Sequence, residues 1–285
     1  MRKIVLCPNI QRDGDFAYTA GVKAMLEAEG CRVAVSPVCG EIDESALPFE
    51  AVDLDEALAD ADLLITLGGD GTILRIAPQV MRHNAPLVGV NLGHTGFLTE
   101  LDRENIDLLK TAAAGDFEIV PRMMLDVEVR RNGECVFFDT VLNEAVISGI
   151  VQSVHLTAKG DGDRILTFSG DGVIVSSPTG STAYSMAAGG PLVEPGAEAI
   201  VLTPICAHML AARSFVLSHK RTVTVIPADV SDGRRCVLSP DGRGMIDLQD
   251  GDEVIVTKSK YRLLMANLGT RSFYETAFEK LGERA

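Results

Sequence analysis

A carboxylate stands inside a glycine-rich turn at residues 68–72, where the chain reads Gly-Gly-Asp-Gly-Thr. The apolar run 63–67 predicts a buried strand before the turn, and Thr72 is a candidate N-cap for the helix that follows. Glycine permits left-handed backbone angles and lets a ligand approach the main chain closely. The N–H groups at a helix start attract anions. The candidate phosphate-binding residues are therefore Gly68, Gly69, Gly71 and Thr72.

Asp70 is the residue of this turn that phosphate binding alone does not explain. A carboxylate repels phosphate, so we interpret Asp70 as a group that handles a proton, a hydroxyl or a metal ion. The alternative is a plain turn former, because Asp-Gly is common between a strand and a helix. The chemical role is favoured because the whole Gly-Gly-Asp-Gly-Thr string directly follows a buried strand.

A second polar pair, Asn143 and Glu144, interrupts an apolar stretch in the second half of the chain. Neighbours in a regular strand point to opposite faces, so one of the two would enter the apolar side. Burying an unpaired Glu is costly. Either the strand is irregular here or both groups meet a polar ligand, which Asn and Glu can hydrogen-bond. The plainer alternative is a Glu on a domain surface.

The most specific stretch covers residues 169–191. A buried strand over 172–176 runs into a Pro-Thr-Gly turn, and a short helix then begins at Ser181 or Thr182. This helix start again offers N–H groups and hydroxyls to a ligand. By themselves, Asp171 could be a turn residue and Tyr184 a core residue.

These motifs together resemble the NAD kinase family. Gly-Gly-Asp-Gly-Thr resembles the glycine-rich motif of the superfamily that holds NAD kinases, diacylglycerol and sphingosine kinases and, more distantly, phosphofructokinases. Residues 91–99 are similar to the family's NxGxxGFL segment, with His94 interpreted as a loop residue rather than a catalyst. The Asn-Glu pair matches its NE motif, and Asp241-Gly242 matches a late DG. Residues 171–191 closely resemble the signature DGxIVSTPTGSTAYxxxAGGP.

The resemblance implies transfer of the γ-phosphoryl of ATP, or of polyphosphate, to the 2′-hydroxyl of the adenosine ribose of NAD. Asp70 would accept the hydroxyl proton, Mg²⁺ would accompany ATP without a dedicated protein metal site, and the protein would be a homodimer or homotetramer. The residues implied for the NAD site are Asp70, Gly71, Arg75, Asn143, Glu144, Asp171, Thr182, Ala183, Tyr184, Ser185, Met186 and Ala187.

Two alternatives remain open at this point. One is a lipid or other small-alcohol kinase of the same superfamily, and the other is a catalytically silent dinucleotide sensor. The net charge of −14 weighs against the lipid branch, whose substrates sit in membranes. The sensor requires a missing catalytic group, whereas Asp70 is present.

Composition indicates an ordinary folded chain of 285 residues, long enough for two domains. The net charge of −14 argues against nonspecific binding to nucleic acid or to anionic membranes. No run is long and apolar enough to span a membrane or to form a signal-peptide core, so we expect a cytoplasmic protein. Six cysteines without paired spacing predict free thiols, buried by default.

Strand and helix patterns alternate in the first part of the chain and predict an open, mostly parallel, Rossmann-like α/β sheet with helices on both faces. After Pro121 the pattern becomes β-rich, with a hairpin turn at Asn132-Gly133 and separate strands at 254–257 and 261–268. We predict an α/β nucleotide-binding kinase domain at 1–118, with 261–285 packing back on it, and a β-rich, sandwich-like NAD-binding domain at 119–260.

A terminal amphipathic helix is predicted at the end of the chain. Its apolar stripe should lie buried against the first domain. The stripe consists of Phe273, Tyr274, Ala277, Phe278 and Leu281.

Overall fold

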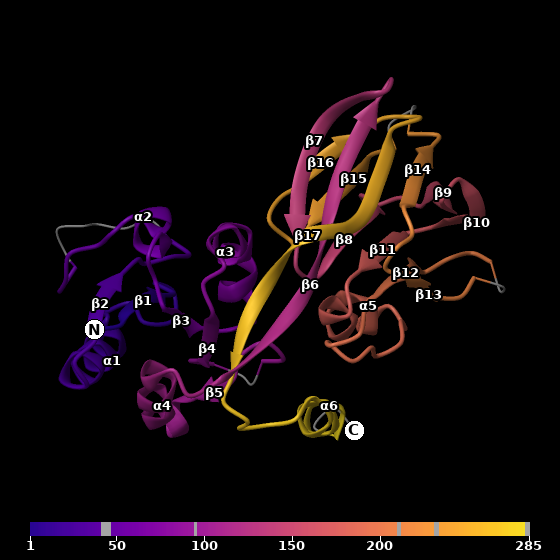
Figure 1. Cartoon of the computed structure of the whole chain (residues 1–285). Coiled ribbons are helices and arrows are strands. Elements are labelled where there is room, and N and C mark those ends of the chain that lie inside the picture. The colour runs from indigo at the N-terminus through magenta and orange to yellow at the C-terminus, as the bar shows by residue number, and fades with distance from the viewer. Residues whose placement is uncertain (41–46, 94–95, 210–211, 231–233, 283–285) are drawn as a thin grey trace. The chain divides into compact units, whose positions relative to one another are not determined.

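A computed structural model describes residues 1–40, 47–93, 96–209, 212–230 and 234–282. The chain forms two compact units (Figure 1). The first unit combines Met1–Pro121 with Leu263–Ala285, and the second is Arg122–Arg262. Residues 91–99, which begin at the end of β4 (Leu87–Asn91), make up the second glycine-rich turn, and its residues His94 and Thr95 lie outside the described residues.

The first unit is built on a parallel sheet, as the alternating pattern predicted. Its strands pair in the order β4-β3-β1-β2, with Leu6 opposite both Val35 and Ile65. All residues of β3 and β4 are buried, which is typical of parallel strands covered on both faces. The strands are β1 (Lys3–Pro8), β2 (Arg32–Val35), β3 (Leu63–Gly68) and β4 (Leu87–Asn91), with the short β5 (Leu101–Asp102) beside β4.

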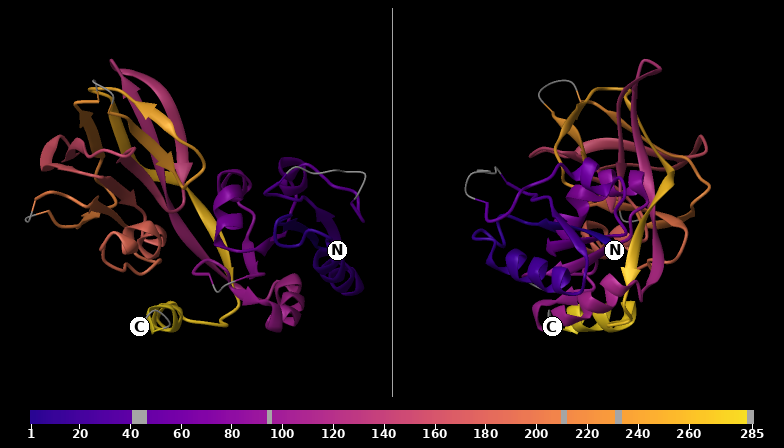
Figure 2. Two further views of the ribbon diagram at one scale, coloured as in Figure 1. Left: turned by 180° about the vertical axis from the view of Figure 1, so that it is seen from behind. Right: turned by 60° about the vertical axis from the view of Figure 1, so that its left-hand side comes forward.

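Helices cover both faces of this sheet (Figure 2). On one face Leu26 and Leu109 pack with Leu6 and Ile65 in a single apolar cluster. On the other, a β-carbon added at Gly89 would lie 2.8 Å from the side chain of Ile73, so helix and sheet are in close contact there. The helices are α1 (Ala17–Ala28), α2 (Leu54–Leu58), α3 (Asp70–His83) and α4 (Leu109–Ala114), with a 3₁₀ helix η2 (Arg103–Leu108) before α4.

Two long strands, β6 (Glu118–Arg131) and β17 (Glu253–Asn267), have residues in both units. The prediction of two separate strands at 254–257 and 261–268 is wrong, because β17 runs through both without a break. The polar residues at 258–260 carry no Gly or Pro that would end a strand. Val256 of β17 pairs with Val223 in the second unit, and Met265 pairs with Leu87 in the first.

The second unit is an antiparallel β-sandwich, which confirms the predicted β-rich fold. A six-stranded sheet, in the order β13-β12-β11-β8-β15-β16, faces strands of the sheet that contains β10-β9-β14-β17. Side chains of both sheets, such as Ile147 and Leu156, form one core. The strands are β7 (Glu134–Val141), β8 (Glu144–Gly149), β9 (Val154–Gly160), β10 (Asp163–Gly170), β11 (Gly172–Ser176), β12 (Ala199–Ile205), β13 (Phe215–Ser218), β14 (Val223–Ala228), β15 (Cys236–Pro240) and β16 (Ile246–Leu248).

The terminal helix α6 (Phe273–Gly282) forms as predicted, but the prediction that its apolar stripe is buried is wrong for Tyr274 and Phe278. The side chain of Leu281 lies outside the described part of the chain. Phe278 is 80% exposed and Tyr274 is 66% exposed, whereas Ala277 is 8% exposed. Partly buried Phe273 and Lys280 lie on the same side as Ala277. The inward face of α6 therefore carries Phe273, Ala277 and Lys280, and it does not include Tyr274 and Phe278.

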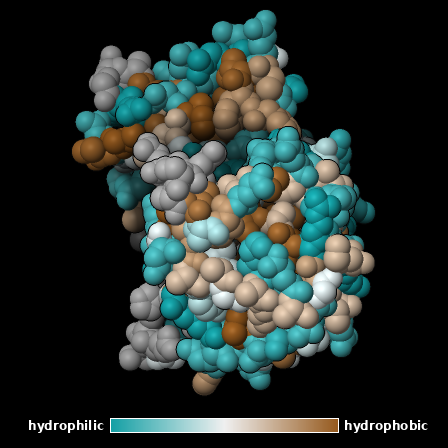
Figure 3. All heavy atoms as spheres, turned by 90° about the vertical axis from the view of Figure 1, so that its left-hand side faces the viewer, coloured by the Kyte–Doolittle hydropathy of each residue, from teal (hydrophilic) through white to brown (hydrophobic). Residues whose placement is uncertain are grey.

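Hydrophilic and hydrophobic residues are mixed over the face of the molecule drawn in Figure 3. Figure 3 shows teal hydrophilic residues interspersed with smaller brown patches over the face that it presents. None of the helices in the described ranges is long and apolar enough to cross a membrane. The cysteines are free, as predicted, but the expectation of burial holds only for Cys7 and Cys236, because Cys135 and Cys206 are exposed.

Candidate active site

The glycine-rich turn of the first unit joins β3 to α3, but α3 begins earlier than predicted. The N-cap is Gly69, with extended angles of φ −167° and ψ −173°, and Asp70 is the first helical residue. Thr72, the predicted N-cap, is the third. Its Oγ1 accepts hydrogen bonds from the Gly69 N–H at 3.3 Å and from Nδ2 of Asn9 at 2.9 Å. The side chain of Thr72, in the first turn of α3, therefore accepts the N–H of the N-cap residue Gly69, and we call this contact the reverse cap.

The turn needs glycine because a side chain would not fit or would block access, and not because of unusual backbone angles. Gly68, Gly69 and Gly71 do not take left-handed angles. A β-carbon at Gly68 would collide with Oγ1 of Thr72, so any side chain there would break the reverse cap. Gly71 is exposed and has open space above its α-carbon. A ligand can therefore approach the backbone closely at Gly71.

Asp70 is held by the last residues of the second glycine-rich turn. Its Oδ2 accepts a hydrogen bond from the Phe97 N–H at 2.7 Å. Its Oδ1 accepts from the N–H groups of Leu98 at 3.1 Å and Thr99 at 3.3 Å. These three donors fix the carboxylate without a cationic side chain, and charge-assisted bonds of this kind are strong. The two turns on neighbouring strands therefore meet at Asp70.

A cavity of about 500 Å³ opens beside this carboxylate, lined by residues of the first unit. Its lining is polar and includes the exposed Arg75, one turn into α3. In the described part of the chain, no group of three or more His, Cys, Asp or Glu side chains could hold a metal ion by itself. The lining residues are Asn9, Gln11, Arg12, Cys39, Gly68, Gly69, Asp70, Gly71, Thr72, Arg75, Asn91, Gly93, Gly96 and Lys280.

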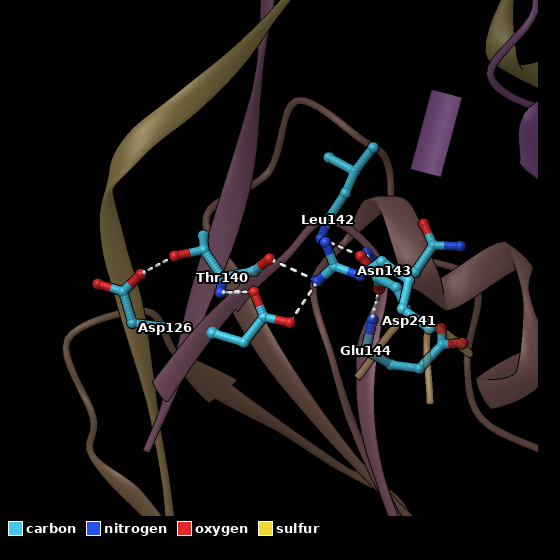
Figure 4. A network of polar contacts seen from close by, with 8 residues as sticks. Asp126, Thr140, Leu142, Asn143, Glu144 and Asp241 are labelled. Atoms are coloured by element: carbon cyan, nitrogen blue, oxygen red, sulfur yellow. Dashed lines mark hydrogen bonds and ion pairs between the residues drawn. The ribbon is translucent and has the colours of Figure 1, made fainter. Parts of the chain in front are cut away.

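The Asn143-Glu144 pair of the second unit lies where the chain leaves β7 and enters β8. The strand is irregular here, since β7 ends at Val141 and β8 begins at Glu144, and this confirms one of the two alternatives. The carboxylate of Asp241 organises the turn (Figure 4). It accepts hydrogen bonds from the N–H groups of Leu142, Asn143 and Glu144 at 2.7, 2.9 and 2.9 Å.

A polar network lies beside the turn (Figure 4). Nη2 of Arg243 donates to Oδ2 of Asp139 at 2.9 Å and to the carbonyl of Thr140 at 2.8 Å. Oγ1 of Thr140 donates to Asp126 at 2.8 Å. Burial raises the pKa of Asp241, while the three backbone donors and nearby Arg243 oppose that rise.

Glu144 is a buried carboxyl group without a cationic partner among the contacts described. Burial, and secondarily the neighbouring Asp241, raise its pKa to about 8. Among the residues that the structure describes, its Oε2 has no hydrogen-bond partner, and neither do Oδ1 of Asn143, Oγ1 of Thr179 and Oγ of Ser176. Ser176 lies directly opposite Glu144 in the sheet. Several unpaired buried polar atoms at one turn are unusual in a folded protein and are consistent with a polar ligand.

The helix predicted to begin at Ser181 or Thr182 is split in two. A 3₁₀ turn η3 (Thr179–Thr182) precedes α5 (Tyr184–Ala187), and Ala183 between them is non-helical. The backbone carbonyl of Asn143 fills the space beside Gly180, where a β-carbon would collide with it. The N–H of Ser177 donates to the same carbonyl at 2.8 Å. This segment and the Asn-Glu turn are therefore packed together.

The other predicted residues of this segment differ in exposure. The hydroxyls of Ser185 and Thr203 are hydrogen-bonded in the interior at 2.9 Å, and Thr182 donates to the carbonyl of Thr179 at 3.1 Å. Tyr184 and Ala187 are exposed and Met186 is partly buried. Asp171 is exposed before β11, and its side chain accepts a hydrogen bond that raises the pKa of the Cys206 thiol.

Sequence reasoning missed Asn9, Arg12 and Lys280 as residues of the cavity, and it missed the structural role of Asp241. Asn9 and Arg12 follow the carboxyl end of β1, which is where ligands bind in open parallel sheets, so that rule could have found them. No local signal marks Lys280, because only packing brings α6 to the cavity.

Comparison with known proteins gives one consistent result. Residues 11–116 match the family model described as ATP-NAD kinase N-terminal domain, and residues 139–268 match the ATP-NAD kinase C-terminal domain. The chain is 35% identical to an NAD kinase of Acetivibrio thermocellus, over 100% of this chain and 98% of the relative.

Two solved structures share the fold. A yeast NADH kinase complexed with NADH matches with a TM-score of 0.82 and 23% identity, over 99% of this chain and 88% of that one. An NAD kinase from Archaeoglobus fulgidus in complex with ATP matches with a TM-score of 0.75 and 24% identity, over 98% of each chain.

Proposed function

The chain belongs to the NAD kinase family, and from this premise we propose how its own residues carry out the transfer of phosphate from ATP to NAD. The acceptor is the 2′-hydroxyl of the adenosine ribose, and the product is NADP. We assign the phosphoryl donor to the first unit and most of NAD recognition to the second, while Asp70, Gly71 and Arg75 of the first unit also serve NAD. The relatives bound to ATP and to NADH support these two ligand classes.

Asp70 is the proposed proton acceptor, and its fixed position beside the cavity is the observation that carries the proposal. Phosphoryl transfer depends mainly on positioning and on charge neutralisation. Three backbone N–H groups hold the Asp70 carboxylate at the edge of a polar cavity in the first unit. A carboxylate so held keeps one orientation as the hydroxyl approaches, and it accepts the proton as the new P–O bond forms.

The donor phosphates would meet the glycine-rich turn. Gly71 exposes backbone at the start of α3, where N–H groups and the helix dipole favour anions. Arg75 lines the same cavity and supplies positive charge. Gly68, Gly69 and Thr72 shape the turn through the reverse cap. In this proposal Gly71 and Arg75 serve the phosphates of both nucleotides.

Magnesium fits this cavity as an ion that arrives with the nucleotide. Mg²⁺ is commonly bound by one or two carboxylates together with substrate phosphates, rather than by a protein cage. In the lining that the structure describes, the available carboxylate is Asp70, and no multi-residue cage is present among the described residues. When bound, the ion would neutralise charge on the transferring phosphoryl group.

NAD recognition is assigned to the Asn-Glu turn and the segment packed on it. Oδ1 of Asn143 and Oε2 of Glu144 are buried acceptors without partners, which an amide or hydroxyl of the dinucleotide would satisfy. With a pKa of about 8, Glu144 is largely protonated near pH 7 and can also donate a hydrogen bond. Asp171 and residues 182–187 complete the proposed NAD site.

Family resemblance and composition support a proposal for the assembly and the location of the protein. We propose a cytoplasmic homo-oligomer, a dimer or a tetramer, that does not act on nucleic acid or membranes. ATP is the proposed donor, and polyphosphate is its alternative. The family match does not favour a lipid kinase.

The experiment that tests this function couples product formation to an NADP-specific dehydrogenase. Purified protein is incubated with ATP, Mg²⁺ and NAD, and NADP should accumulate. An NAD analogue that lacks the adenosine 2′-hydroxyl should bind but should not be phosphorylated. Phosphorylation of that analogue as fast as NAD would show that transfer goes to another oxygen.

A further inference from the structure

We propose that Arg12 and Lys280 bind the phosphates of the donor nucleotide, so that the C-terminal helix α6 is part of the donor site. This inference rests on the proposed function, because it concerns the donor of the same reaction. Both side chains line the cavity beside Asp70, yet neither belongs to the glycine-rich turn. They come from opposite ends of the chain and reach the cavity through separate contacts.

Arg12 is positioned by a compact turn after β1. The carbonyl of Asn9 accepts hydrogen bonds from the N–H groups of Arg12 at 2.9 Å and Asp13 at 3.0 Å. The side chain of Asn9 donates to Oγ1 of Thr72, which caps α3. The Arg12 turn and the glycine-rich turn are therefore joined by a direct hydrogen bond.

The Arg12 guanidinium extends from this turn over a glycine of the second glycine-rich turn. A β-carbon added at Gly93 would lie 3.3 Å from Nη1 of Arg12. Both Gly93 and Arg12 line the cavity. The absence of a side chain at Gly93 therefore leaves room for the guanidinium at the cavity wall. A guanidinium suits this place because its planar fork can donate two hydrogen bonds to one phosphate.

Lys280 reaches the cavity across an aromatic ring. Its Nζ lies 4.2 Å from the ring centroid of Phe97, within the range of a cation–π interaction. The backbone N–H of Phe97 in turn donates to Asp70. Lys280 also lies on the inward side of α6, beside buried Ala277. The packing of α6 therefore places an ammonium group on the ring of Phe97, the residue whose backbone N–H holds the proposed base.

The charge of the lining fits a polyanion. Among the described residues that line the cavity, Arg12, Arg75 and Lys280 are cationic and Asp70 alone is a carboxylate. This local excess of positive charge stands out in a chain with a net charge of −14. A cavity lined by one sign of charge concentrates ligands of the opposite sign. A nucleoside triphosphate, or its isolated triphosphate chain, has the matching chemistry.

The test compares Arg12→Met and Lys280→Met with two matched controls in the same unit. Arg82→Met removes an exposed arginine from the last turn of α3, and Lys110→Met removes an exposed lysine from α4. KM for ATP is measured at saturating NAD, and KM for NAD at saturating ATP. Inorganic tripolyphosphate binding to each protein is measured by calorimetry in the absence of NAD.

Each Met variant should raise KM for ATP and weaken tripolyphosphate binding by roughly tenfold or more, the loss expected for one charge-assisted hydrogen bond. KM for NAD should stay within about twofold, and the controls should match wild type, because exposed charges far from a site contribute little. Arg12→Lys should recover part of the loss, since it keeps the charge without the fork.

Three outcomes overturn the inference. The first is an unchanged KM for ATP in both Met variants. The second is a parallel rise in both KM values with a lowered melting temperature, which indicates a structural role. The third is equal tripolyphosphate binding in wild type and variants. A wild-type protein that forms no NADP contradicts the proposed function instead, and the tripolyphosphate comparison then still decides whether these two residues bind phosphate.

Discussion

The carboxylate of Asp70 occupies space that Gly96 leaves open. A β-carbon at Gly96 would collide with Oδ1 of Asp70, and the next residue, Phe97, donates its N–H to Oδ2 at 2.7 Å. The proposed base is therefore positioned by a missing side chain together with the backbone donors beside it. This relationship explains why a glycine precedes the donor segment 97–99.

Gly96→Ala should displace the Asp70 carboxylate while leaving its chemistry intact. We expect kcat to fall by roughly 10²-fold, the scale on which small misplacements of catalytic groups act. Gly21→Ala is the matched control, because a β-carbon at Gly21 meets open space within α1. That control should keep full activity and gain about 0.5–1 kcal/mol in unfolding free energy. Equal kcat values for the two variants would contradict the positioning role of Gly96.

Asp70→Asn should preserve the shape of the side chain and remove its charge. If Asp70 is the base, kcat should fall by roughly 10²–10⁴-fold, toward the low end if the proton leaves late. NAD binding should change far less than turnover, because a base acts mainly in the transition state. Both are measured on one folded preparation.

Asp53→Asn is the control for Asp70→Asn, because Asp53 also accepts backbone N–H groups but caps α2 instead. It should leave kcat unchanged. An Asp70→Asn protein with more than about a tenth of wild-type kcat would remove Asp70 from the catalytic role.

Glu144 should make the stability of the protein depend on pH. Burial raises the pKa of its carboxyl from 4.5 to about 8, so between these values the folded protein holds a proton that the unfolded chain has lost. The free energy of unfolding must therefore fall as pH rises through this window, by at most about 1.4 kcal/mol per pH unit. Below the window both states are protonated, and above it both are ionised.

Glu144→Gln removes this titration and isolates its effect. Urea unfolding is measured from about pH 5 to about pH 8.5, and the stability of wild type relative to Glu144→Gln should decline across that range. Glu134→Gln, which changes an exposed carboxyl of the same unit, should run parallel to wild type. A constant difference between wild type and Glu144→Gln would show that Glu144 does not hold the extra proton.

A carboxylate should destabilise the protein far more at Ala277 than at the neighbouring Phe278. Ala277→Asp places a charge at a buried position and should cost several kcal/mol. Phe278→Asp changes a side chain that is 80% exposed and should alter stability by no more than about 0.5 kcal/mol. Thermal unfolding of both variants measures the contrast. A larger loss for Phe278→Asp would show that this ring is covered in solution.

The sequence indicated those features that depend on the preferences of one short segment, such as the free-energy cost of burying a charged side chain. The apolar run 63–67 specified a buried strand. The cost of burying Glu144 led to two alternatives, an irregular strand or a polar ligand, and the strand is indeed interrupted at the Asn-Glu pair. The Asn132-Gly133 hairpin followed from two residues that tolerate positive φ, and both have it.

Features that depend on distant contacts could not be predicted in the same way. The start of α3 depends on the side chain of Thr72, which Asn9 holds from another strand end. The inward face of α6 depends on what the helix packs against, and periodicity alone does not fix that direction. The role of Asp241 depends on N–H groups almost one hundred residues earlier in the chain.

The continuity of β17 also has a consequence for how the protein is made. β17 leaves the ribosome after β4 and β14, yet it supplies a strand to each unit through Val256 and Met265. Until it emerges, the edge of β4 at Leu87 and the edge of β14 at Val223 lack a partner, and open strand edges invite misassembly. A nascent chain that stalls before residue 253 therefore completes neither unit, so translation to the end of β17 is the step that commits both halves to their native sheets.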